Sequence, residues 1–266
     1  MLAPVTPGQP FNYSQSGADW GGLCTAGRQQ SPIDISTASA GVSSSPPIRI
    51  DYRPQINYAV NTVPYNEWVI IPVNNNSTLT AADGTVFYLH NIHFHQVGEH
   101  SLDGQLATLE AHYVHSTSSD ATATGQRIAV LAILFYLSED FAPDPFLNQI
   151  VPFVAGGPAN VSTGRVLDFT SVTVPNGPAD YVTYVGSLTQ PPCTEGVTWY
   201  VTTKPRYASQ AQIILLMSAT AGVSGGARTN NRPIQPLYNR TITGIGLTYA
   251  TGPTNTGSPA IPRPGP

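Results

Sequence analysis

The chain has 266 residues, of which 41% are hydrophobic and only 10% are charged, and its formal net charge is −4. This length and apolar content can fill one large core, and all-β single domains of this size are common. No basic patch indicates a nucleic-acid partner, and no run of about eighteen apolar residues indicates a membrane span.

Strand-like segments dominate the chain. Residues 1–10 contain Pro and Gly and are expected to form an N-terminal arm, and the folded domain is expected over residues 11–250. Runs of β-branched and aromatic residues follow at short intervals, with turn clusters such as 74–77 and 82–84 between them. The longest apolar run, from Ile128 to Leu137, is expected to be a buried central strand.

Clear helical signals are few. A short helix is expected to start at Asp144, where the following Pro suits a first helical turn. The clearest helix covers about residues 210–218, with Ser209 as its N-cap and Gln212 completing a capping box. The tail over 251–266 is rich in Pro, Gly and Thr and is expected to be extended or disordered. The prediction is a mainly β single domain with a few short helices.

Three histidines on two expected strands are the main chemical signal. His93 and His95 lie two residues apart, and so do Glu110 and His112. Side chains on a strand repeat every two residues, so each pair shares a face. If the strands are neighbours, three imidazoles can converge, and three neutral imidazoles with an open fourth position make a catalytic zinc site. The alternative is a set of ordinary polar strand residues, and the spacing alone leaves both interpretations open.

The cysteines and the glycosylation acceptors bear on the compartment. Cys24 and Cys193 are either two buried free thiols or one disulfide, and a disulfide requires an oxidising compartment. The acceptor pattern N-x-S/T, weak at any single place, occurs at Asn12, Asn75, the overlapping Asn76, Asn160 and Asn239. These matches favour a secreted protein or one in another oxidising compartment. The first residues lack an apolar segment, so a signal peptide is expected to be absent from this chain.

Four sequence blocks add a family resemblance. They are QSPIDI (30–35), HFHQVGEHSLDG with LEAHYVH (93–104 and 109–115), SLTQPPC with VTW (187–193 and 197–199) and NNRPIQPL (230–237). In this order they resemble the motifs of the α-class carbonic anhydrases, in the secreted form with one disulfide. The blocks span about residues 13 to 240, so the resemblance covers most of the chain.

The resemblance implies a fold and a reaction. The fold would be a large, twisted, mostly antiparallel central sheet with peripheral helices. The reaction would be the reversible hydration of CO2 to bicarbonate and a proton by hydroxide formed on a bound Zn2+, with a side esterase activity of the same hydroxide. CO2 and bicarbonate would be the partners, and the oligomeric state stays open between monomer and dimer. The alternative is a binding or storage protein on the same fold that lacks a zinc ligand, but none is missing.

The resemblance also assigns roles to single residues. The zinc ligands would be His93, His95 and His112. Asn91, Glu110 and the backbone carbonyl of Asn230 would each accept a hydrogen bond from one ligand, with Asn91 one methylene shorter than the usual Gln. Thr189 would donate its hydroxyl proton to Glu99, so that it can only accept from the attacking oxygen.

Further expectations concern the substrate pocket and the loop that follows it. The resemblance assigns an apolar pocket wall for CO2 to Val114, Val130, Leu188, Val197 and Trp199. It pairs Cys24 with Cys193 in a disulfide, and it implies cis peptide bonds at Ser31–Pro32 and Pro191–Pro192. His100 and His115 match positions that the family uses structurally.

The proton relay is the clearest departure from the family. Many fast members carry a histidine in the segment that corresponds to 59–73, but this segment contains none. Glu67 lies near the relay position, and an exposed carboxyl with a pKa near ~4.3 is a poor relay at neutral pH. His90 is the second candidate, although strict strand alternation would turn it away from the zinc. Proton release to buffer is therefore expected to limit turnover.

Overall fold

The computed structural model describes residues 11–53, 56–61, 68–72, 74, 76–154, 161–169, 180–223 and 229–245, with the backbone alone in 56–61, 153–154, 161–165 and 220–223. This part contains sixteen strands, three α-helices and one 3-10 helix, so the prediction of a mainly β fold is confirmed. The expected arm 1–10, the tail 251–266 and Glu67 lie outside the described residues.

The elements follow one another in this order: α1 (Leu23–Ala26), β1 (Asp34–Ile35), the 3-10 helix η1 (Thr37–Ser39), β2 (Gly41–Val42), β3 (Arg49–Asp51), β4 (Ile56–Asn61), β5 (Val69–Pro72), β6 (Thr78–Thr80), β7 (Val86–His95), β8 (Ser101–Leu102), β9 (Gln105–Leu106), β10 (Leu109–Ser116), β11 (Ile128–Leu137), α2 (Leu147–Val154), β12 (Val161–Leu167), β13 (Tyr181–Ser187), β14 (Glu195–Thr202), β15 (Arg206–Ala208), α3 (Gln210–Val223) and β16 (Thr243–Ile245).

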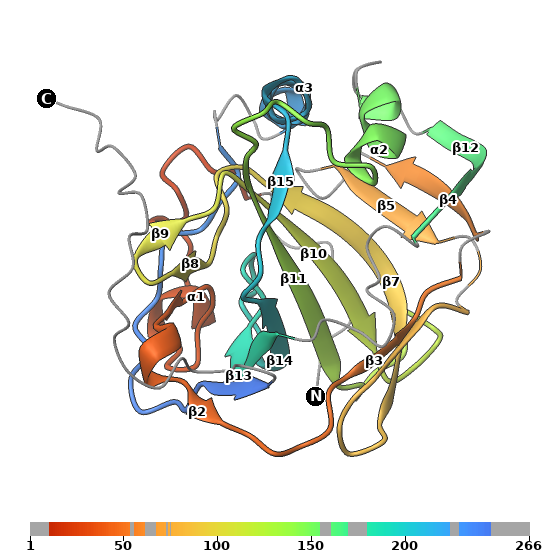
Figure 1. Cartoon of the computed structure of the whole chain (residues 1–266). Coiled ribbons are helices and arrows are strands. Elements are labelled where there is room, and N and C mark those ends of the chain that lie inside the picture. The colour runs from red at the N-terminus through yellow and green to blue at the C-terminus, as the bar shows by residue number, and fades with distance from the viewer. Residues whose placement is uncertain are drawn as a thin grey trace, which may run out of the picture.

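One curled mixed sheet organises the molecule. Its main path runs β12-β4-β5-β7-β10-β11-β14-β13-β16-β2, while β1, β8 and β9 form a separate small sheet. Most neighbours are antiparallel, and the parallel pairs in the large sheet are β11 with β14, β11 with β15 and β16 with β2. The long strands β7, β10 and β11 lie side by side at the centre, with α2 and α3 at one end of them (Figure 1).

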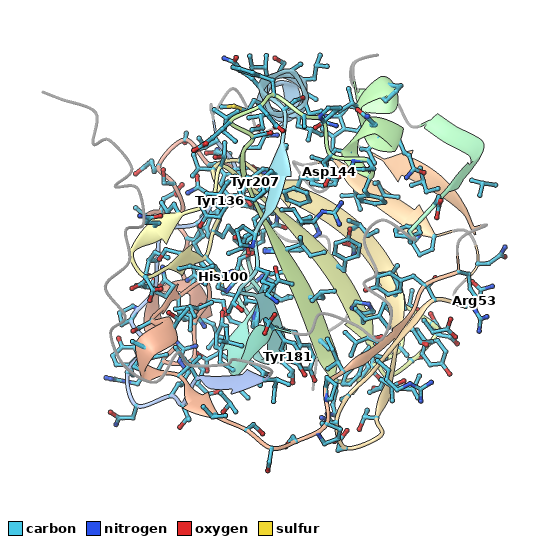
Figure 2. The ribbon with its side chains drawn as sticks, viewed as in Figure 1. Arg53, His100, Tyr136, Asp144, Tyr181 and Tyr207 are labelled. Atoms are coloured by element: carbon cyan, nitrogen blue, oxygen red, sulfur yellow. A yellow bond between two sulfur atoms is a disulfide. The ribbon has the colours of Figure 1, made fainter. Side chains whose placement is uncertain are left out.

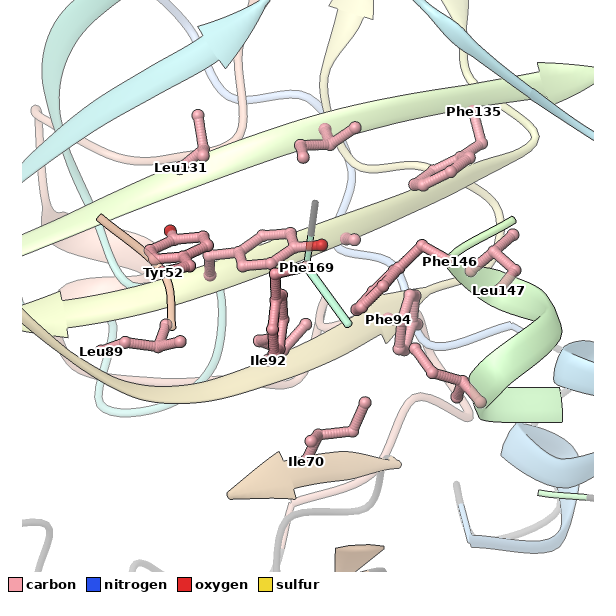
Figure 3. Close-up of a cluster of buried hydrophobic side chains, with 14 of the residues drawn as sticks. Tyr52, Ile70, Leu89, Ile92, Phe94, Leu131, Phe135, Phe146, Leu147 and Phe169 are labelled. Atoms are coloured by element: carbon pink, nitrogen blue, oxygen red, sulfur yellow. The ribbon is translucent and has the colours of Figure 1, made fainter. Parts of the chain in front are cut away.

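The central strand β11 separates two apolar clusters. Its odd-numbered residues from Ala129 to Phe135 belong to the first apolar cluster, which also contains Ile92 and Phe94 of β7. Figure 3 shows this cluster with Tyr52, Phe146 and Phe169 closing it. The even-numbered residues of β11 belong to the second apolar cluster, which consists of Ile33, Ile35, Ala40, Ala107, Val130, Ala132, Leu134, Val182, Tyr184, Val197, Trp199, Val201 and Ile242. Burial on both faces explains why this strand reads as a continuous apolar run.

The helices differ from the sequence prediction at their ends. Ser209 and Gln212 make the expected reciprocal bonds, with Gln212 N–H donating to Ser209 Oγ at 3.3 Å and Ser209 N–H donating to Gln212 Oε1 at 3.1 Å. The second helix begins at Leu147 rather than at Asp144, because Asp144 caps it by accepting from the N–H of Phe146 and of Leu147. Asp144 lies where α2 and α3 approach each other (Figure 2). Among the described helices, none is long and apolar enough to cross a bilayer.

A β-bulge interrupts the pairing of β7 with β10. Val114 pairs with Asn91, but the next residue of β10 pairs with Leu89, which leaves His90 as the extra residue. Leu89 and Ile92 therefore both enter the first apolar cluster, although their numbers differ in parity. His90 and Asn91 consequently lie on the other face of the strand. The expectation that strict alternation turns His90 away from the face of His93 is wrong.

Candidate active site

The three histidines expected to bind zinc come together where β7 and β10 pair. His93 lies opposite His112, and Glu110 lies opposite His95, in the antiparallel register of the two strands. His93 Nε2 and His112 Nδ1 are 3.3 Å apart. One nitrogen from each of the three rings lies within 4.8 Å of the others. Two strands with a two-residue repeat thus bring three imidazoles to one point, as the spacing indicates.

Each of these rings is fixed through its other nitrogen. His93 Nδ1 lies 2.8 Å from Asn91 Oδ1, so the shorter side chain does reach the ring. His95 Nδ1 lies 2.8 Å from the carbonyl oxygen of Asn230, and His112 Nε2 lies 2.7 Å from Glu110 Oε1. Since all three partners are acceptors, each of these nitrogens is the one that carries the proton and donates. The remaining nitrogen of each ring then presents a lone pair.

The three lone pairs face one another, which tests whether a metal fits. His95 Nε2 is buried and has no hydrogen-bond partner. Burial, aided by the neighbouring His112, lowers the pKa of His95 to about 3, and burial lowers the pKa of His93 and of His112 as well. The rings are therefore neutral near pH 7, and no proton lies between their lone pairs. A cation at this point would satisfy all three nitrogens, and three neutral imidazoles are a donor set that Zn2+ accepts.

Glu110 is the most heavily bonded carboxylate near the site. Its Oε1 accepts from His112 Nε2 and, at 2.6 Å, from His100 Nδ1, while its Oε2 accepts from the backbone N–H of Glu99 and of His100, each at 2.7 Å. Burial would raise the pKa of Glu110, but its electrostatic interactions and hydrogen bonds with His100 and His112 hold the pKa well below its usual value. Four donors satisfy this carboxylate, so His100, Glu110 and His112 form a hydrogen-bond network rather than a second metal site.

Glu99 and Thr189 are both buried, but no hydrogen bond joins the Thr189 hydroxyl to Glu99 among the contacts of the described residues, so this expected contact stays a prediction. Glu99 Oε1 accepts from the backbone N–H of Arg232 at 2.8 Å and lies 3.5 Å from His95 Nδ1. Thr189 follows β13 by two residues and is 5% exposed. The carbonyl of Ser187, at the end of β13, accepts from Trp199 Nε1 at 3.0 Å. These contacts position the loop that contains Thr189 against β14.

The five residues expected to form the CO2 pocket lie together. Val114, Val130 and Trp199 form one row across β10, β11 and β14, because Val114 pairs with Val130 and Val130 pairs with Trp199. Val197 belongs to the same second apolar cluster, and Leu188 packs against it from the loop. The Trp199 ring lies 4.8 Å from the His112 ring, measured between centroids. The apolar row therefore reaches the candidate metal centre at His112.

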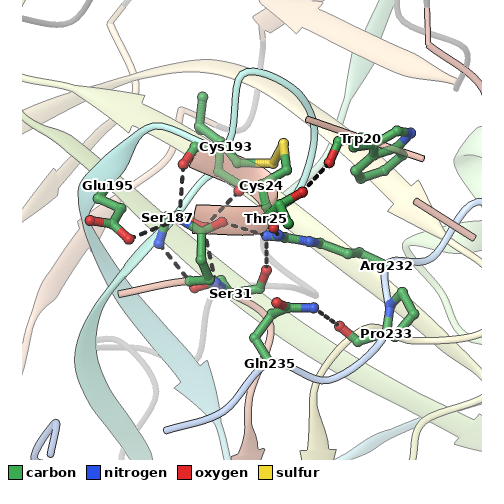
Figure 4. Close-up of a disulfide and its surroundings, with 12 residues drawn as sticks. Trp20, Cys24, Thr25, Ser31, Ser187, Cys193, Glu195, Arg232, Pro233 and Gln235 are labelled. Carbon is green, nitrogen blue, oxygen red and sulfur yellow. Dashed lines mark hydrogen bonds between the residues drawn. A yellow bond between two sulfur atoms is a disulfide. The ribbon is translucent and has the colours of Figure 1, made fainter. Parts of the chain in front are cut away.

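The expected disulfide is present, and the peptide bonds have the expected form. Cys24 and Cys193 are bonded, with a Cα–Cα distance of 5.0 Å and a sequence separation of 169 (Figure 4). The bonds Ser31–Pro32 and Pro191–Pro192 are cis, as the resemblance implies, and Gln96–Val97 is cis as well. The disulfide joins the N-terminal segment to the loop that contains Thr189.

Arg232 is a central residue that sequence reasoning missed. Its guanidinium is buried and donates to Gln30 Oε1 at 2.9 Å, to the Ser31 carbonyl at 2.7 Å and to the Cys24 carbonyl at 2.7 Å (Figure 4). Its backbone N–H also holds Glu99. Arg232 thus links the N-terminal segment that contains Cys24 to Glu99 of the candidate site. The signal in the sequence was its place in the fourth block, two residues after Asn230.

Comparisons with known proteins agree with this geometry. The family model of the eukaryotic-type carbonic anhydrases matches residues 15–245. Dioscorin DB3S from Dioscorea polystachya is 30% identical over 242 residues, which cover 89% of this chain and 83% of dioscorin. A carbonic anhydrase from Neisseria gonorrhoeae is 31% identical over 220 residues, which cover 83% of this chain and 79% of that protein. The crystal structure of a halotolerant carbonic anhydrase from Dunaliella salina superposes with a TM-score of 0.76 at 28% identity, over 91% of this chain and 100% of that chain. The chain therefore belongs to the eukaryotic-type carbonic anhydrase family, an enzyme family whose reaction is the hydration of CO2.

Proposed function

We propose that this protein is a zinc-dependent carbonic anhydrase, converting CO2 and water reversibly to bicarbonate and a proton. The observation that supports this most strongly is the convergence of three neutral imidazole lone pairs from His93, His95 and His112. Zn2+ held by these nitrogens would activate a water molecule for attack on CO2 near neutral pH.

The residues around the ligands would hold them in the productive form. Asn91, Glu110 and the Asn230 carbonyl accept the ring protons, so each histidine keeps the tautomer that presents its lone pair to the metal. Such partners typically contribute 10–100-fold to metal affinity. Asn91 and Glu110 lie in strands, and Asn230 is hydrogen-bonded to Phe94 and Gln96. The ligand geometry would therefore be set before the metal binds.

The substrate would be positioned by an apolar surface and one hydroxyl. CO2 has no net charge, and the row Val114, Val130 and Trp199 offers it a surface that water solvates poorly. Thr189 would donate its only hydroxyl proton to Glu99, so it could accept only from the attacking oxygen. That restriction would orient a lone pair of this oxygen toward the CO2 carbon.

A binding protein without hydration activity is the second candidate. It is favoured by one observation, namely that a crystal structure of dioscorin complexed with ascorbate is similar to this chain, with a TM-score of 0.73 at 28% identity. The complete set of three histidines with their three acceptors argues for the enzyme instead. A side esterase activity at the same centre belongs to the enzyme proposal.

Metal content and hydration rate would separate the candidates. We expect about one zinc per chain by mass spectrometry after gentle purification. We also expect stopped-flow CO2 hydration that a chelator removes and added Zn2+ restores, with hydrolysis of 4-nitrophenyl acetate following the same pattern. Added Mg2+ serves as the control, because it prefers oxygen ligands and should restore nothing. A zinc-free protein that hydrates no CO2 after zinc addition would support the binding protein.

We further propose secretion or residence in another oxidising compartment. The Cys24–Cys193 disulfide supports this, since such bonds persist only where the redox poise allows. Three glycosylation acceptors, Asn12, Asn76 and Asn239, are exposed, while Asn75 and Asn160 lie outside the described residues. Protein from its native cells should lose mass on enzymatic removal of N-glycans. Two free thiols in that protein would contradict the proposed compartment.

A further inference from the structure

One histidine near the site is neither a candidate metal ligand nor part of the buried hydrogen-bond network. Of the six histidines of the chain, His93, His95 and His112 converge at the candidate metal centre. His100 bonds through both ring nitrogens, to Glu110 and Tyr184, and His115 contacts Tyr52 on the other face of the sheet. The sixth histidine, His90, is the residue that the β-bulge adds to β7.

The hydrogen bonds of His90 define its tautomer. Its Nε2 lies 2.9 Å from the carbonyl oxygen of Ser118 and 2.7 Å from Ser116 Oγ. Because a carbonyl oxygen can only accept, Nε2 carries the proton of the neutral ring. Nδ1 therefore keeps its lone pair, and it makes no hydrogen bond to the residues that the structure describes. The ring is thus anchored at one nitrogen and basic at the other.

The bulge sets the distance between His90 and the candidate centre. His90 lies three residues before His93 on the same face of β7, which corresponds to about 10 Å along the strand. Two or three water molecules would span such a gap. Val114 and Ser116 of β10 lie on this face as well, and Ser116 anchors the ring.

The surroundings of His90 keep its ring titratable. The ring is half-buried, and this burial lowers the pKa of His90, while the Ser118 carbonyl and the negative charge of Asp120 act in the opposite direction. Asp120 is the acidic group that raises the pKa of this ring, and His115 of β10 is a second titratable group that interacts electrostatically with it. Imidazole is the side chain whose ordinary pKa lies between pH 5 and 8, and the partial exposure of His90 leaves its ring in contact with solvent.

We propose that His90 is the proton relay of this enzyme, in a position that replaces the histidine missing from residues 59–73. The proposal rests on the proposed function. Each hydration consumes one CO2 and one water and yields one bicarbonate and one proton. Nδ1 of His90 accepts this proton through intervening water, and the imidazolium then releases it to buffer and returns to its neutral tautomer. Turnover then has a component that is independent of buffer, contrary to the expectation from sequence.

Exchange of ¹⁸O between CO2 and water tests the relay on the zinc-loaded protein. This measurement reports the interconversion of CO2 and bicarbonate separately from the proton-dependent release of labelled water. His90→Gln is the variant of choice, because its amide can still donate to the Ser118 carbonyl but cannot take up a proton at neutral pH. We expect the water-release rate at low buffer to fall about tenfold or more, with the interconversion rate unchanged. Added imidazole should restore the water-release rate.

Tyr88→Phe is the matched control, since Tyr88 lies on the same face of β7 two residues before His90 and should leave both rates unchanged. Equal water-release rates in His90→Gln and wild type would overturn the relay. So would a parallel loss of both rates in His90→Gln alone, which would make His90 structural. Loss of both rates in the wild type itself would instead reject the proposed function, and the relay with it.

A second measurement does not depend on activity. The ¹⁵N chemical shifts of His90 in the wild type should show a neutral ring protonated at Nε2 that titrates with a pKa below the usual 6.5. Ser116→Ala should leave this titration in place, because the Ser118 carbonyl remains as acceptor. A ring protonated at Nδ1, or one that does not titrate between pH 5 and 8, would overturn the assignment.

Discussion

The two faces of the strand pair β7 and β10 differ in what their side chains do. One face places Ile92 and Phe94 in the first apolar cluster, where they are almost completely buried. The other face presents His93 and His95 to the candidate metal centre. Neighbouring residues of one strand therefore contribute alternately to stability and to chemistry. Substitutions one residue apart should consequently have opposite effects.

The largest expected effect is on the site face. His112→Ala should remove a direct ligand, so zinc binding and CO2 hydration should fall by more than the 10–100-fold typical for losing a partner of a ligand. Glu110 would lose one of its four donors, and the metal-free protein should lose only about 1–3 kcal/mol of unfolding free energy. Zinc analysis, stopped-flow hydration and urea unfolding would measure the three quantities. Retained zinc at full stoichiometry would refute the ligand assignment.

Removal of the disulfide should affect the loop with Thr189 more than the apolar core. Replacing Cys24 and Cys193 together by Ser opens a loop of 169 residues, and the chain-entropy model gives a loss of about 5 kcal/mol. Activity should respond more than the far-ultraviolet circular dichroism, because the bond holds the loop with Thr189. Thiol titration of the unfolded, unreduced wild type should find no free thiol, and two thiols would contradict the pairing.

The core face should show the reverse of the ligand variant. Ile92→Ala leaves a cavity in the first apolar cluster and should cost about 2–5 kcal/mol of unfolding free energy. The folded fraction should still bind one zinc, because the side chain points away from His93. Denaturant unfolding and zinc analysis would measure both values. Loss of zinc from a fully folded variant would mean that the two faces are not independent.

Two variants of Asn91 test how far the hydrogen-bond acceptor of His93 supports zinc binding. Asn91→Ala removes the acceptor of His93 and should weaken zinc binding about 10–100-fold, with little change in stability. Asn91→Gln restores the residue usual in the family and should bind zinc within a few-fold of the wild type. Competition with a chromophoric chelator would give both affinities. Equal affinities for Asn91→Ala and wild type would show that the 2.8 Å contact does not support the ligand.

The last comparison concerns the pH dependence of stability and the histidines on the two faces. Burial lowers the pKa of both His95 and His115 to about 3, so each takes up a proton more readily when unfolded. The unfolding free energy of the metal-free protein should therefore fall as pH drops from about 6.5 toward 3. Each of the two histidines should contribute up to about 1.4 kcal/mol per pH unit to this fall. His115→Gln should reduce this slope, measured by urea unfolding at several pH values. An unchanged slope would mean that His115 is not neutral in the folded state.

Local pattern predicts much of the fold, while most residues of the candidate site are assigned by the family resemblance rather than by spacing. The two-residue spacings of His93 with His95 and of Glu110 with His112 imply that each pair shares a face, and the apolar run of β11 implies a strand buried on both sides. The register between strands is not local information, so the bulge at His90 could not be predicted from the spacing. The same holds for Arg232, whose hydrogen bonds join segments that no sequence period relates.

The start of the second helix shows a smaller failure of the same kind. Asp144 looks like a first helical residue because Pro follows it, but its side chain caps the helix and also pairs with Arg206 at 2.5 Å. Gln212 of α3 donates to the Asp144 carbonyl at 2.9 Å. A residue bound by two distant segments adopts the conformation that they allow, and helix boundaries are accordingly the least predictable features.

The position of Arg232 in the chain has a consequence for synthesis on the ribosome. Its guanidinium reaches the Cys24 carbonyl across 208 residues, and its N–H supplies the donor for Glu99. The neighbouring Asn230 supplies the acceptor for His95. A nascent chain that has not yet exposed this segment already contains every histidine and the acceptors of His93 and His112, but it lacks the acceptor of His95 and the donor that holds Glu99. Completion of the site therefore waits for the last part of the domain to be translated, and a prematurely terminated chain would bear the three ligands without this support.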